Sequence, residues 1–394
     1  MSPPEELSVE FAHDLIGWHL ANSHSKWTHR LRSVLSGLHV SDSDRLEKVG
    51  GFFDLGDEIR QLASQMESGS ASGRSRAEVR EIESHLERLR GLRAALRNDV
   101  EETIESEVST VIRANGLGLF GDLVFPPVDV RLEAPPMLLV TSPRDRIERL
   151  DDVLLEPDMS IESREEVEER VTGKLGLSSL VLEIGGVATY PASVHHGADL
   201  RNTLRLAAHE WVHHYLVLKP LGRNPYSTPE LMVLNETVAS IAGDEIGDLA
   251  FTAMHAQMPK DGGNAEVDEV DFHVADLIEH TEVDFGTLMR ETRVTVNNLL
   301  AEGNIEEAES YMEEQRKLLT ESGHPIRKLN QAYFAFYGTY AHGPASVDPI
   351  GPQVRRLREL SEDVGEFLTL AGSVTSSEGL LELIARIESA GSSQ

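Results

Sequence analysis

The stretch LAAHEWVHHY, residues 206–215, constrains the fold most, because it places ionisable side chains inside an apolar run. The residues around its histidines and glutamate are uncharged, and no proline interrupts them. Burying an ionisable group without a partner costs several kcal/mol. The run therefore predicts a buried helix, over about residues 200–218, in which the histidines and the glutamate share a common partner.

His209, Glu210 and His213 form the pattern HExxH within this run. Four residues of α-helix turn the chain by about 400°, so the two histidines project from nearly the same face, one turn apart. Two imidazoles in that relation can share one tetrahedral Zn²⁺ at about 2.0–2.1 Å each. Glu210 lies about 100° around the helix, where it is predicted to be the general base for a zinc-bound water.

A zinc site of this kind needs a third protein ligand, and Glu236 is the best candidate. It is the only charged residue of the apolar run LMVLNETVASIAG, residues 231–243, so it has the same burial problem as the histidines. Coordination of the same metal by Glu236 solves both problems. The alternative pattern, with glycine and histidine three and six residues after His213, fails because Leu216 and Lys219 occupy those positions.

Two other carboxylates near this run have different expected roles. Glu230 lies in the first turn of the predicted helix over residues 229–246, where it is expected to interact with the helix dipole. Asp244 is eight residues from Glu236, on roughly the same helix face two turns on. It is either a partner that holds a ligand imidazole or a solvated charge near the end of the helix.

HEWVH followed by NETVA resembles the gluzincin metallopeptidases, and the resemblance covers about residues 135–345. It implies that zinc is held by His209, His213 and Glu236, with Glu210 as the base. It also implies that SLVLEIGGVATYPASV, residues 179–194, contains the edge strand that pairs with an extended substrate. An ordinary sheet strand is the alternative for that segment.

Two features depart from the family. The GxMEN motif of many gluzincin aminopeptidases is absent, and Ser240 stands where many relatives carry an aspartate that orients a ligand histidine. Downstream, KLNQAYFAFYGTYAHG faintly resembles the LNNAxLxxxRTY stretch of a bacterial predicted-aminopeptidase group, with Gly338 in place of the arginine. That resemblance makes Tyr340 the candidate donor to the oxyanion. Tyr337, His342 and simple aromatic packing are the alternatives.

Composition excludes several classes of function. The chain has no cysteine, which rules out disulfides, thiolate ligands and a thiol nucleophile. A net charge of −31 argues against nucleic acid and anionic membranes as partners. No apolar stretch approaches the roughly 20 residues of a membrane span, and the N-terminus lacks the features of a secretory signal. We therefore expect a cytoplasmic protein.

The pattern of apolar residues predicts an α+β fold that is mainly α. Helices are expected over residues 76–115, 163–176, 200–218, 229–246, 270–302, 304–321, 325–341 and 352–370, and strands within residues 135–143 and 179–194. Residues 7–38 have helix-like spacing, and 67–75 are read as a linker. The expected regions are a helical N-terminal region with the long helix (1–120), a zincin-like catalytic region with a small mixed sheet (121–345) and a C-terminal helical segment (346–394).

The function predicted from these motifs is hydrolysis of peptide bonds in a peptide or protein substrate by a zinc-dependent hydrolase. Two alternatives remain open at this stage. The metal could brace the helices of a non-catalytic binding or scaffold protein, or the zinc site could hydrolyse non-peptide amides or esters.

Overall fold

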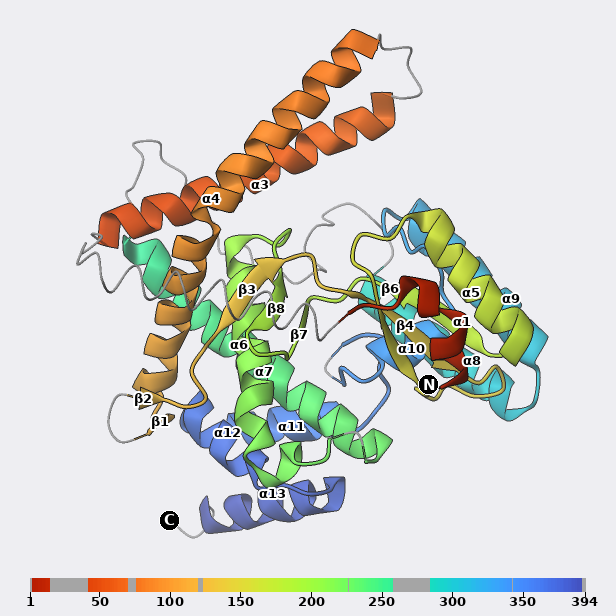
Figure 1. The fold of residues 1–394 in the computed structure, drawn as a ribbon. Coiled ribbons are helices and arrows are strands. Elements are labelled where there is room, and N and C mark those ends of the chain that lie inside the picture. Colours follow the sequence, from red (N-terminus) through yellow and green to blue (C-terminus); the bar gives the residue numbers. More distant parts are fainter. Residues whose placement is uncertain are drawn as a thin grey trace.

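The computed structural model describes residues 2–14, 42–69, 76–119, 123–225, 227–257, 284–341 and 343–391. Within them the chain is mainly helical with small sheets (Figure 1), which confirms the expected α+β, mainly α class. Most of the helix-like stretch at residues 7–38 lies outside the described residues. So do residues 70–75 of the expected linker, 270–283 of an expected helix, and His342.

The helices are α1 (Pro3–Leu7), α3 (Asp42–Gly69), α4 (Arg76–Ala114), α5 (Ile161–Leu175), α6 (Leu200–Val217), α7 (Pro229–Gln257), α8 (Phe285–Ala301), α9 (Ile305–Glu321), α10 (Gln331–Tyr337), α11 (Ile350–Glu359), α12 (Val364–Gly372) and α13 (Ser377–Gly391), with 3-10 turns η1 (Val9–Phe11) and η2 (Pro220–Gly222). The strands are β1 (Gly118–Leu119), β2 (Leu123–Val124), β3 (Val130–Glu133), β4 (Met137–Ser142), β5 (Asp152–Leu155), β6 (Ser178–Leu182), β7 (Gly186–Val187) and β8 (Ala192–His195).

Several helix boundaries differ from the expected ones for local reasons. The single helix expected over residues 352–370 is wrong, because the chain forms α11 and α12 with a break between them. Asp363 caps α12 by accepting the Glu366 N–H, which starts a new helix. Asn330 caps α10 in the same way, so that helix begins later than residue 325. Helix α7 continues to Gln257, well past the expected end, and α3 includes Glu67–Gly69 of the expected linker.

The strands form one two-stranded and two three-stranded sheets. One three-stranded sheet has the order β5-β4-β6 and is antiparallel throughout. The other has the order β3-β8-β7, in which β3 and β8 are parallel and β7 is antiparallel to β8. The run at residues 179–194 thus contributes to three strands in two sheets, rather than to one continuous edge.

Helices and the N-terminal segment cover the outer edges of three strands. The carboxylates of Glu101 and Glu105 on α4 accept the backbone N–H groups of Leu132 and Val130 on β3, at 2.8 and 2.9 Å. Glu168 on α5 accepts the Val181 N–H on β6 at 2.7 Å. On β5, the carbonyl of Leu154 accepts the His13 N–H at 3.1 Å. Strand β7 is the edge strand that lies beside α6.

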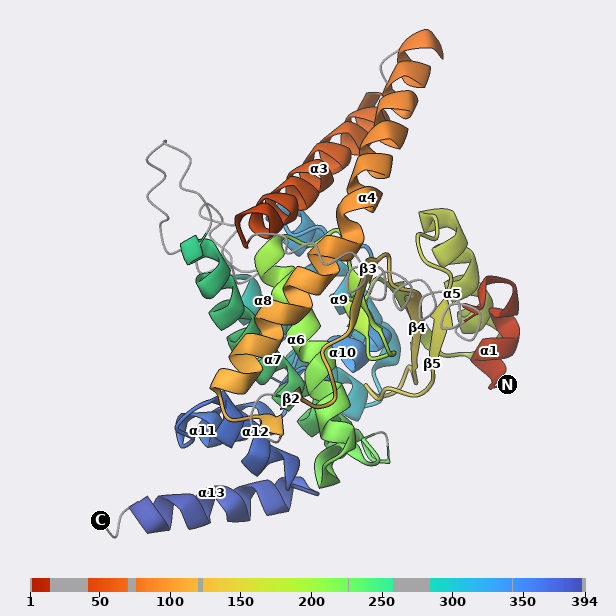
Figure 2. The same cartoon turned by 60° about the vertical axis from the view of Figure 1, so that its left-hand side comes forward.

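The main core surrounds α6 and α7. Buried residues of α3, α4, β3, β8, α11, α12 and α13 all join this one apolar cluster. The helices α3 and α4 form a long hairpin whose far end stands away from the rest of the molecule, as both views show (Figures 1 and 2). The main core thus draws on all three regions expected from the sequence, and the division into those regions stays a prediction. Within the described ranges, no helix is both long and apolar enough to cross a membrane.

Candidate metal centre

Helices α6 and α7 are antiparallel and face each other through polar residues spaced four apart. Because that spacing keeps side chains on one face of a helix, the arginines and histidines of α6 meet carboxylates of α7 across the interface. Arg201 and Arg205 both bind Asp248, with Nε···Oδ1 distances of 2.8 and 2.6 Å, and both histidines meet Glu236. We call these eight residues the polar ladder: Arg201, Arg205, His209 and His213 on α6, and Glu236, Ser240, Asp244 and Asp248 on α7.

Two glycines allow the two helices to approach closely enough for the polar ladder to form. A Cβ atom on Gly243 would lie 2.8 Å from the Cα of His209, and one on Gly247 would lie 2.5 Å from the Cα of Arg205. Both distances are far below ordinary van der Waals contact, so only glycine fits at either position. The backbone of α7 therefore lies directly against the backbone that carries His209.

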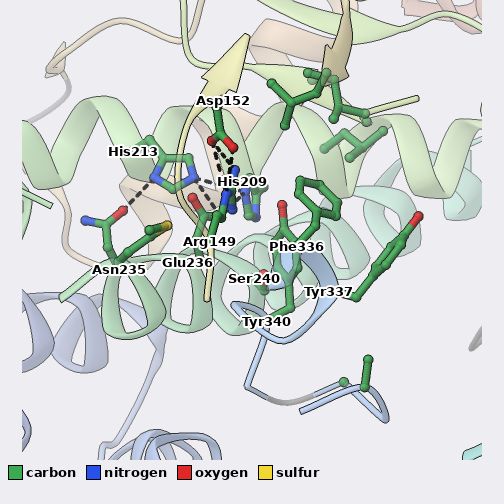
Figure 3. A pocket seen from close by; sticks show the side chains of 18 of the residues that line it. Arg149, Asp152, His209, His213, Asn235, Glu236, Ser240, Phe336, Tyr337 and Tyr340 are labelled. Carbon is green, nitrogen blue, oxygen red and sulfur yellow. Dashed lines mark hydrogen bonds and ion pairs between the residues drawn. The ribbon is translucent and has the colours of Figure 1, made fainter. Parts of the chain in front are cut away.

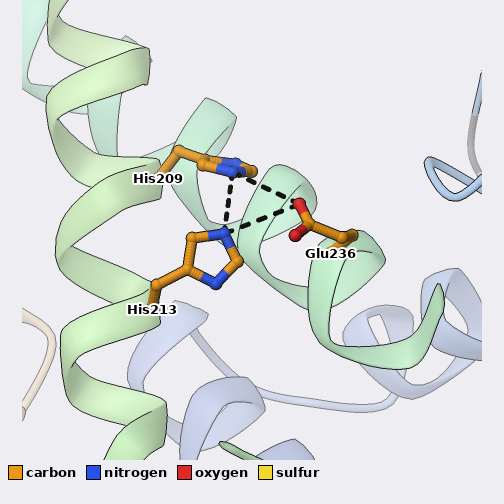
Figure 4. A group of neighbouring side chains, drawn as sticks. All are labelled: His209, His213 and Glu236. Atoms are coloured by element: carbon orange, nitrogen blue, oxygen red, sulfur yellow. Dashed lines mark hydrogen bonds and ion pairs between the residues drawn. The ribbon is translucent and has the colours of Figure 1, made fainter. Parts of the chain in front are cut away.

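His209, His213 and Glu236 converge in one place (Figure 4). The Nε2 atoms of the two histidines are 3.0 Å apart, and they lie 3.7 and 3.6 Å from Oε2 of Glu236. A point equidistant from the three atoms is about 2.0 Å from each, which matches the lengths of Zn–N and Zn–O bonds. These three side chains, which we call the donor trio, can therefore hold a metal ion.

Asn235 fixes the orientation of one histidine in the donor trio. The Nδ1–H of His213 donates to Oδ1 of Asn235 at 2.8 Å, which leaves the lone pair of Nε2 directed toward the other donors. Asn235 is itself almost fully buried. Partners of this kind orient metal ligands and strengthen their binding. The sequence placed Asn235 beside Glu236 but gave it no role, because the contact crosses between two helices.

Without a cation, the donor trio carries an ion pair of its own. Burial alone would lower the pKa of His213, but the Glu236 carboxylate outweighs it and raises that pKa to about 9. Burial alone would raise the pKa of Glu236, but His213, His209 and Arg149 together lower it to about 2. Binding of a metal at Nε2 of His213 therefore requires that histidine to release a proton.

Glu210 lies beside the donor trio, enclosed between α6 and β7. Its side chain is almost fully buried, and burial raises its pKa to about 7. A Cβ atom on Gly186 of β7 would lie 2.5 Å from Oε1 of Glu210, and one on Gly185 would lie 2.6 Å from Cδ2 of Leu206. The Gly-Gly pair in the sequence is thus the feature that lets this sheet edge lie against the helix of the HExxH motif.

The donor trio opens into a cleft of about 1800 Å³ (Figure 3). Tyr340 lines it, and burial, reinforced by the Glu236 charge, keeps the pKa of its hydroxyl well above 10, so the phenol is a hydrogen-bond donor. The chain after Tyr340 is tied to α7, since the Ala341 N–H donates to the Thr237 hydroxyl at 3.2 Å. The tyrosine predicted from the sequence therefore lies in the same cleft as the donor trio. Tyr337 lines this cleft too.

Arg149 is a cleft residue that no motif in the sequence singles out. It comes from the loop before β5, and Asp152 holds it through paired hydrogen bonds, with Nε to Oδ1 at 3.0 Å. Its guanidinium lies 5.0 Å from the ring centre of Phe336, and its charge acts on both Glu236 and Tyr340. Nothing in its sequence neighbourhood, SPRDRIERLDD, distinguishes it from the two nearby arginines of the same loop, Arg144 and Arg146.

Glu230, Asp244 and His214 lie outside the donor trio. Glu230 accepts the Ser377 N–H at the start of α13, so it joins two helices. The carboxylate of Asp244 lies 4.0 Å from Nε of Arg205, within the polar ladder. The ring of His214 packs edge-on against Tyr190, with centroids 5.5 Å apart, in the loop that follows β7.

Protein-family models, curated proteins and solved structures were all compared with this chain, and no match was found. The function therefore has to be inferred from the site. Three features bear on function: the donor trio, the carboxylate of Glu210 beside it, and the cleft that both line.

Proposed function

We propose that this chain is a zinc-dependent peptidase with a zincin-like core of the gluzincin type. The observation that carries the proposal is the convergence of His209, His213 and Glu236 at metal-ligand spacing beside Glu210, inside a large cleft. A donor set of two imidazoles and one carboxylate, with a further position open to the cleft, is characteristic of catalytic zinc sites rather than structural ones. Structural zinc sites are closed by four protein ligands.

The residues present fit zinc better than the other common divalent ions. Magnesium and calcium prefer sites built from oxygen donors at higher coordination number. Imidazole nitrogen with a single carboxylate suits zinc and its neighbours in the first transition series. A zinc ion held here would act as a Lewis acid on the scissile carbonyl group and would acidify the attacking water.

Three residues of the chain then have distinct roles in hydrolysis. Glu210, held against β7, accepts the proton of the attacking water and passes it to the leaving amine. Tyr340 donates a hydrogen bond to the carbonyl oxygen as negative charge develops there. Asn235 keeps His213 in the tautomer that presents Nε2 to the metal. Each of these roles uses an atom that the structure holds in or beside the cleft.

Strand β7 supports a peptide as the substrate. The outer edges of β3, β5 and β6 are already hydrogen-bonded to other parts of the chain, whereas β7 is an edge strand whose residues line the cleft beside Glu210. An extended peptide can add to such an edge through backbone hydrogen bonds. This is the arrangement that the resemblance to gluzincins implied for this segment.

The decisive experiment combines metal analysis with one conservative substitution. Purified protein should contain about one zinc per chain, and His209→Ala should lose it. Glu210→Gln should keep the zinc and lose cleavage of a mixed peptide library by at least about a hundredfold, the scale expected for loss of a general base. Less than one zinc in the wild type, with no further loss in His209→Ala, would exclude the metal site.

The same two measurements separate the alternatives. If Glu210→Gln cleaves peptides as fast as the wild type, the base assignment is wrong. If the zinc-loaded wild type cleaves neither peptides nor other amides and esters, the metal braces α6 against α7 in a binding protein. Cleavage of non-peptide amides or esters alone would place the chain among the other zinc hydrolases.

A further inference from the structure

The cleft runs along most of helix α6, with the donor trio in its interior. Its lining residues on that helix extend from Asn202 to Val217, and His209 and His213 lie between these ends. At 1.5 Å per residue this is about 22 Å of helix. An extended peptide advances about 3.3 Å per residue, so the cleft can hold about six or seven residues.

Described residues line the cleft on both sides of the donor trio. On the side of His209 lie Arg205 and Asp244, and on the side of His213 lie Gly222 and the segment 227–229 that leads into α7. A site built to remove single terminal residues needs a wall close to the metal on one side. In the part of the chain that the structure describes, the lining instead continues for several residues in both directions.

Two of the three arginines among the described cleft residues are already paired with carboxylates. A free peptide carboxylate needs a cation to fix it, and Asp152 and Asp248 already bind Arg149 and Arg205. The third cleft arginine, Arg290, is an exposed residue of α8. These charges therefore give no buried anchor for a carboxylate terminus.

The cleft carboxylates also give no buried anchor for a free peptide amine, because Asp151 and Asp284 are exposed and Glu183 and Asp244 lie near arginines. Oε1 of Glu183 accepts from Arg164 at 2.9 Å, and Asp244 lies 4.0 Å from Arg205. In addition, Asp244 is two helical turns from Glu236, which is about 12 Å along α7. That distance is too great for it to hold the amine of the residue being cleaved.

One wall of the cleft is aromatic. It consists of three side chains of α10, which we call the aromatic wall: Tyr333, Phe336 and Tyr337. The rings of Tyr333 and Tyr337 are 4.4 Å apart, and aliphatic side chains of the β5-β4-β6 sheet, including Leu138 and Leu154, back the wall. In Figure 3, Phe336 and Tyr337 lie on the side of the donor trio nearer His209, away from Asn235.

We propose that this cleft binds an extended internal segment of a polypeptide and cleaves it as an endopeptidase. A large apolar side chain next to the scissile bond would lie on the aromatic wall, where its burial contributes to binding. This inference rests on the proposed peptidase function and specifies its substrate class. The two can fail separately, because cleavage of any peptide tests the function and the position of cleavage tests the inference.

The test uses the full-length, zinc-loaded protein and two sets of peptides. One set consists of octapeptides acetylated at the N-terminus and amidated at the C-terminus, with a phenylalanine or an alanine at the central position. The other set has the same sequences with free termini. Mass spectrometry of the products should show internal cleavage of both sets, at rates within about threefold of each other, since no terminal charge is recognised.

Release of single residues from the free peptides, with the blocked ones left intact, would overturn the inference and leave the peptidase function standing. Internal cleavage of the octapeptides but slow cleavage of tripeptides with the same central residue would support it. If no peptide of either set is cleaved, the proposed function fails, and the inference fails with it.

The aromatic wall is tested by substitution at one of its rings. Tyr337→Ala should lower the preference for phenylalanine over alanine at the central position by about tenfold, the range that loss of apolar contacts in a pocket produces. Tyr337→Phe should keep the preference, because the ring and not the hydroxyl forms the wall. Tyr311→Ala, on α9 outside the cleft, is the matched control. An unchanged preference in Tyr337→Ala, with zinc content intact, would show that the side chain binds elsewhere.

Discussion

Two antiparallel helix pairs, α3–α4 and α6–α7, differ in the kind of side chain that they bury between them. Helices α3 and α4 bury mainly apolar side chains between them, with one buried arginine, Arg93, whose Nε donates to the Phe52 carbonyl at 3.1 Å. Their Lys48–Asp99 ion pair is half-exposed. Helices α6 and α7 instead bring the polar ladder into their interface, within the main apolar core. The first pair is what an amphipathic pattern produces without further constraint. The second is stable because its arginines and histidines are paired with carboxylates across the interface.

The glycines of the two pairs show the same contrast. A Cβ on Gly91 of α4 would meet open space, so glycine at that position has no steric cause. A Cβ on Gly243 or Gly247 would collide with the backbone of α6. Of these two pairs, it is therefore α6 and α7 whose glycines bring the helix backbones into close approach, beside the donor trio.

The largest expected effect concerns the donor trio itself. Glu236→Gln removes the charged ligand and should weaken zinc binding by at least about a hundredfold, since even partners of the ligands contribute 10–100-fold. The control is Glu230→Gln on the same helix, which keeps an acceptor for the Ser377 N–H. Isothermal titration of the metal-free proteins with zinc measures both. Equal affinities in the two variants would move the third ligand away from Glu236.

Gly243→Ala tests the close approach of α7 to α6. The added methyl group would lie 2.8 Å from the Cα of His209, so α7 must shift and carry Glu236 with it. We expect the free energy of unfolding to fall by about 1–3 kcal/mol, as for other overpacked interiors, together with weaker zinc binding. Denaturant titration and zinc titration check the two effects. Wild-type zinc affinity in this variant would show that the spacing of the helices does not set the site.

The ion pairs that cross the two interfaces should differ in strength. Asp248→Asn should lower the free energy of unfolding by about 1–2 kcal/mol, because the carboxylate accepts charged hydrogen bonds from both Arg201 and Arg205. Asp99→Asn, at the half-exposed pair with Lys48, should change it by less than about 1 kcal/mol. Urea titration of both variants measures the difference. Equal losses would show that the interior position of the polar ladder adds nothing.

The contribution of Asp248 should also depend on pH. Burial raises its pKa, but the hydrogen bonds from Arg205 and Arg201 outweigh burial and lower it below 3.8. A carboxylate whose pKa is lower in the folded state stabilises the fold above its unfolded pKa and loses that effect as the pH falls through the folded value. The stabilities of wild type and Asp248→Asn should therefore converge below about pH 3.8. A difference that persists undiminished in acid would contradict the ion-pair origin.

The smallest expected effect is a gain. Gly91→Ala places a methyl group in open space on an exposed face of α4. Because alanine is the better helix former, the free energy of unfolding should rise by about 0.5–1 kcal/mol, with zinc binding unchanged. Thermal unfolding of this variant beside Gly243→Ala gives opposite signs for the same chemical change. A loss of stability in both would mean that the α3–α4 pair is as tightly constrained as α6–α7.

Apolar periodicity predicted most helices because this signal is local. The long helix ending at Ala114 and the helix expected over residues 163–176 follow from apolar spacing, whereas the Ser160 cap that starts the second was not predicted. The break between α11 and α12 was not predicted, since the apolar spacing runs on across it. For the site, the same local logic selected His209, His213 and Glu236, because charged or polar groups stranded in apolar helices need a partner.

What lies beyond those residues depends on contacts that cross the fold. The role of Asn235 requires α7 to face α6, and the position of Arg149 requires the loop before β5 to reach the cleft. Gly243 and Gly186 carry no side chain. Their role is visible only in the folded protein, where Gly243 lies against the backbone of His209 and Gly186 lies against the carboxylate of Glu210. Neither kind of residue leaves a periodic or chemical signature in the chain.

The residues along the chain show which groups need a partner, because the apolar neighbours on either side of them predict their burial. That the three donors meet at metal-ligand spacing, beside Glu210 and inside a cleft, follows only from how the helices pack. The difference arises because some interactions join neighbours along the chain and others join distant segments. Helix formation and burial depend on neighbours along the chain, whereas a distance of 3.6 Å between His213 and Glu236 depends on how closely two helices can pack, and here glycine sets that limit.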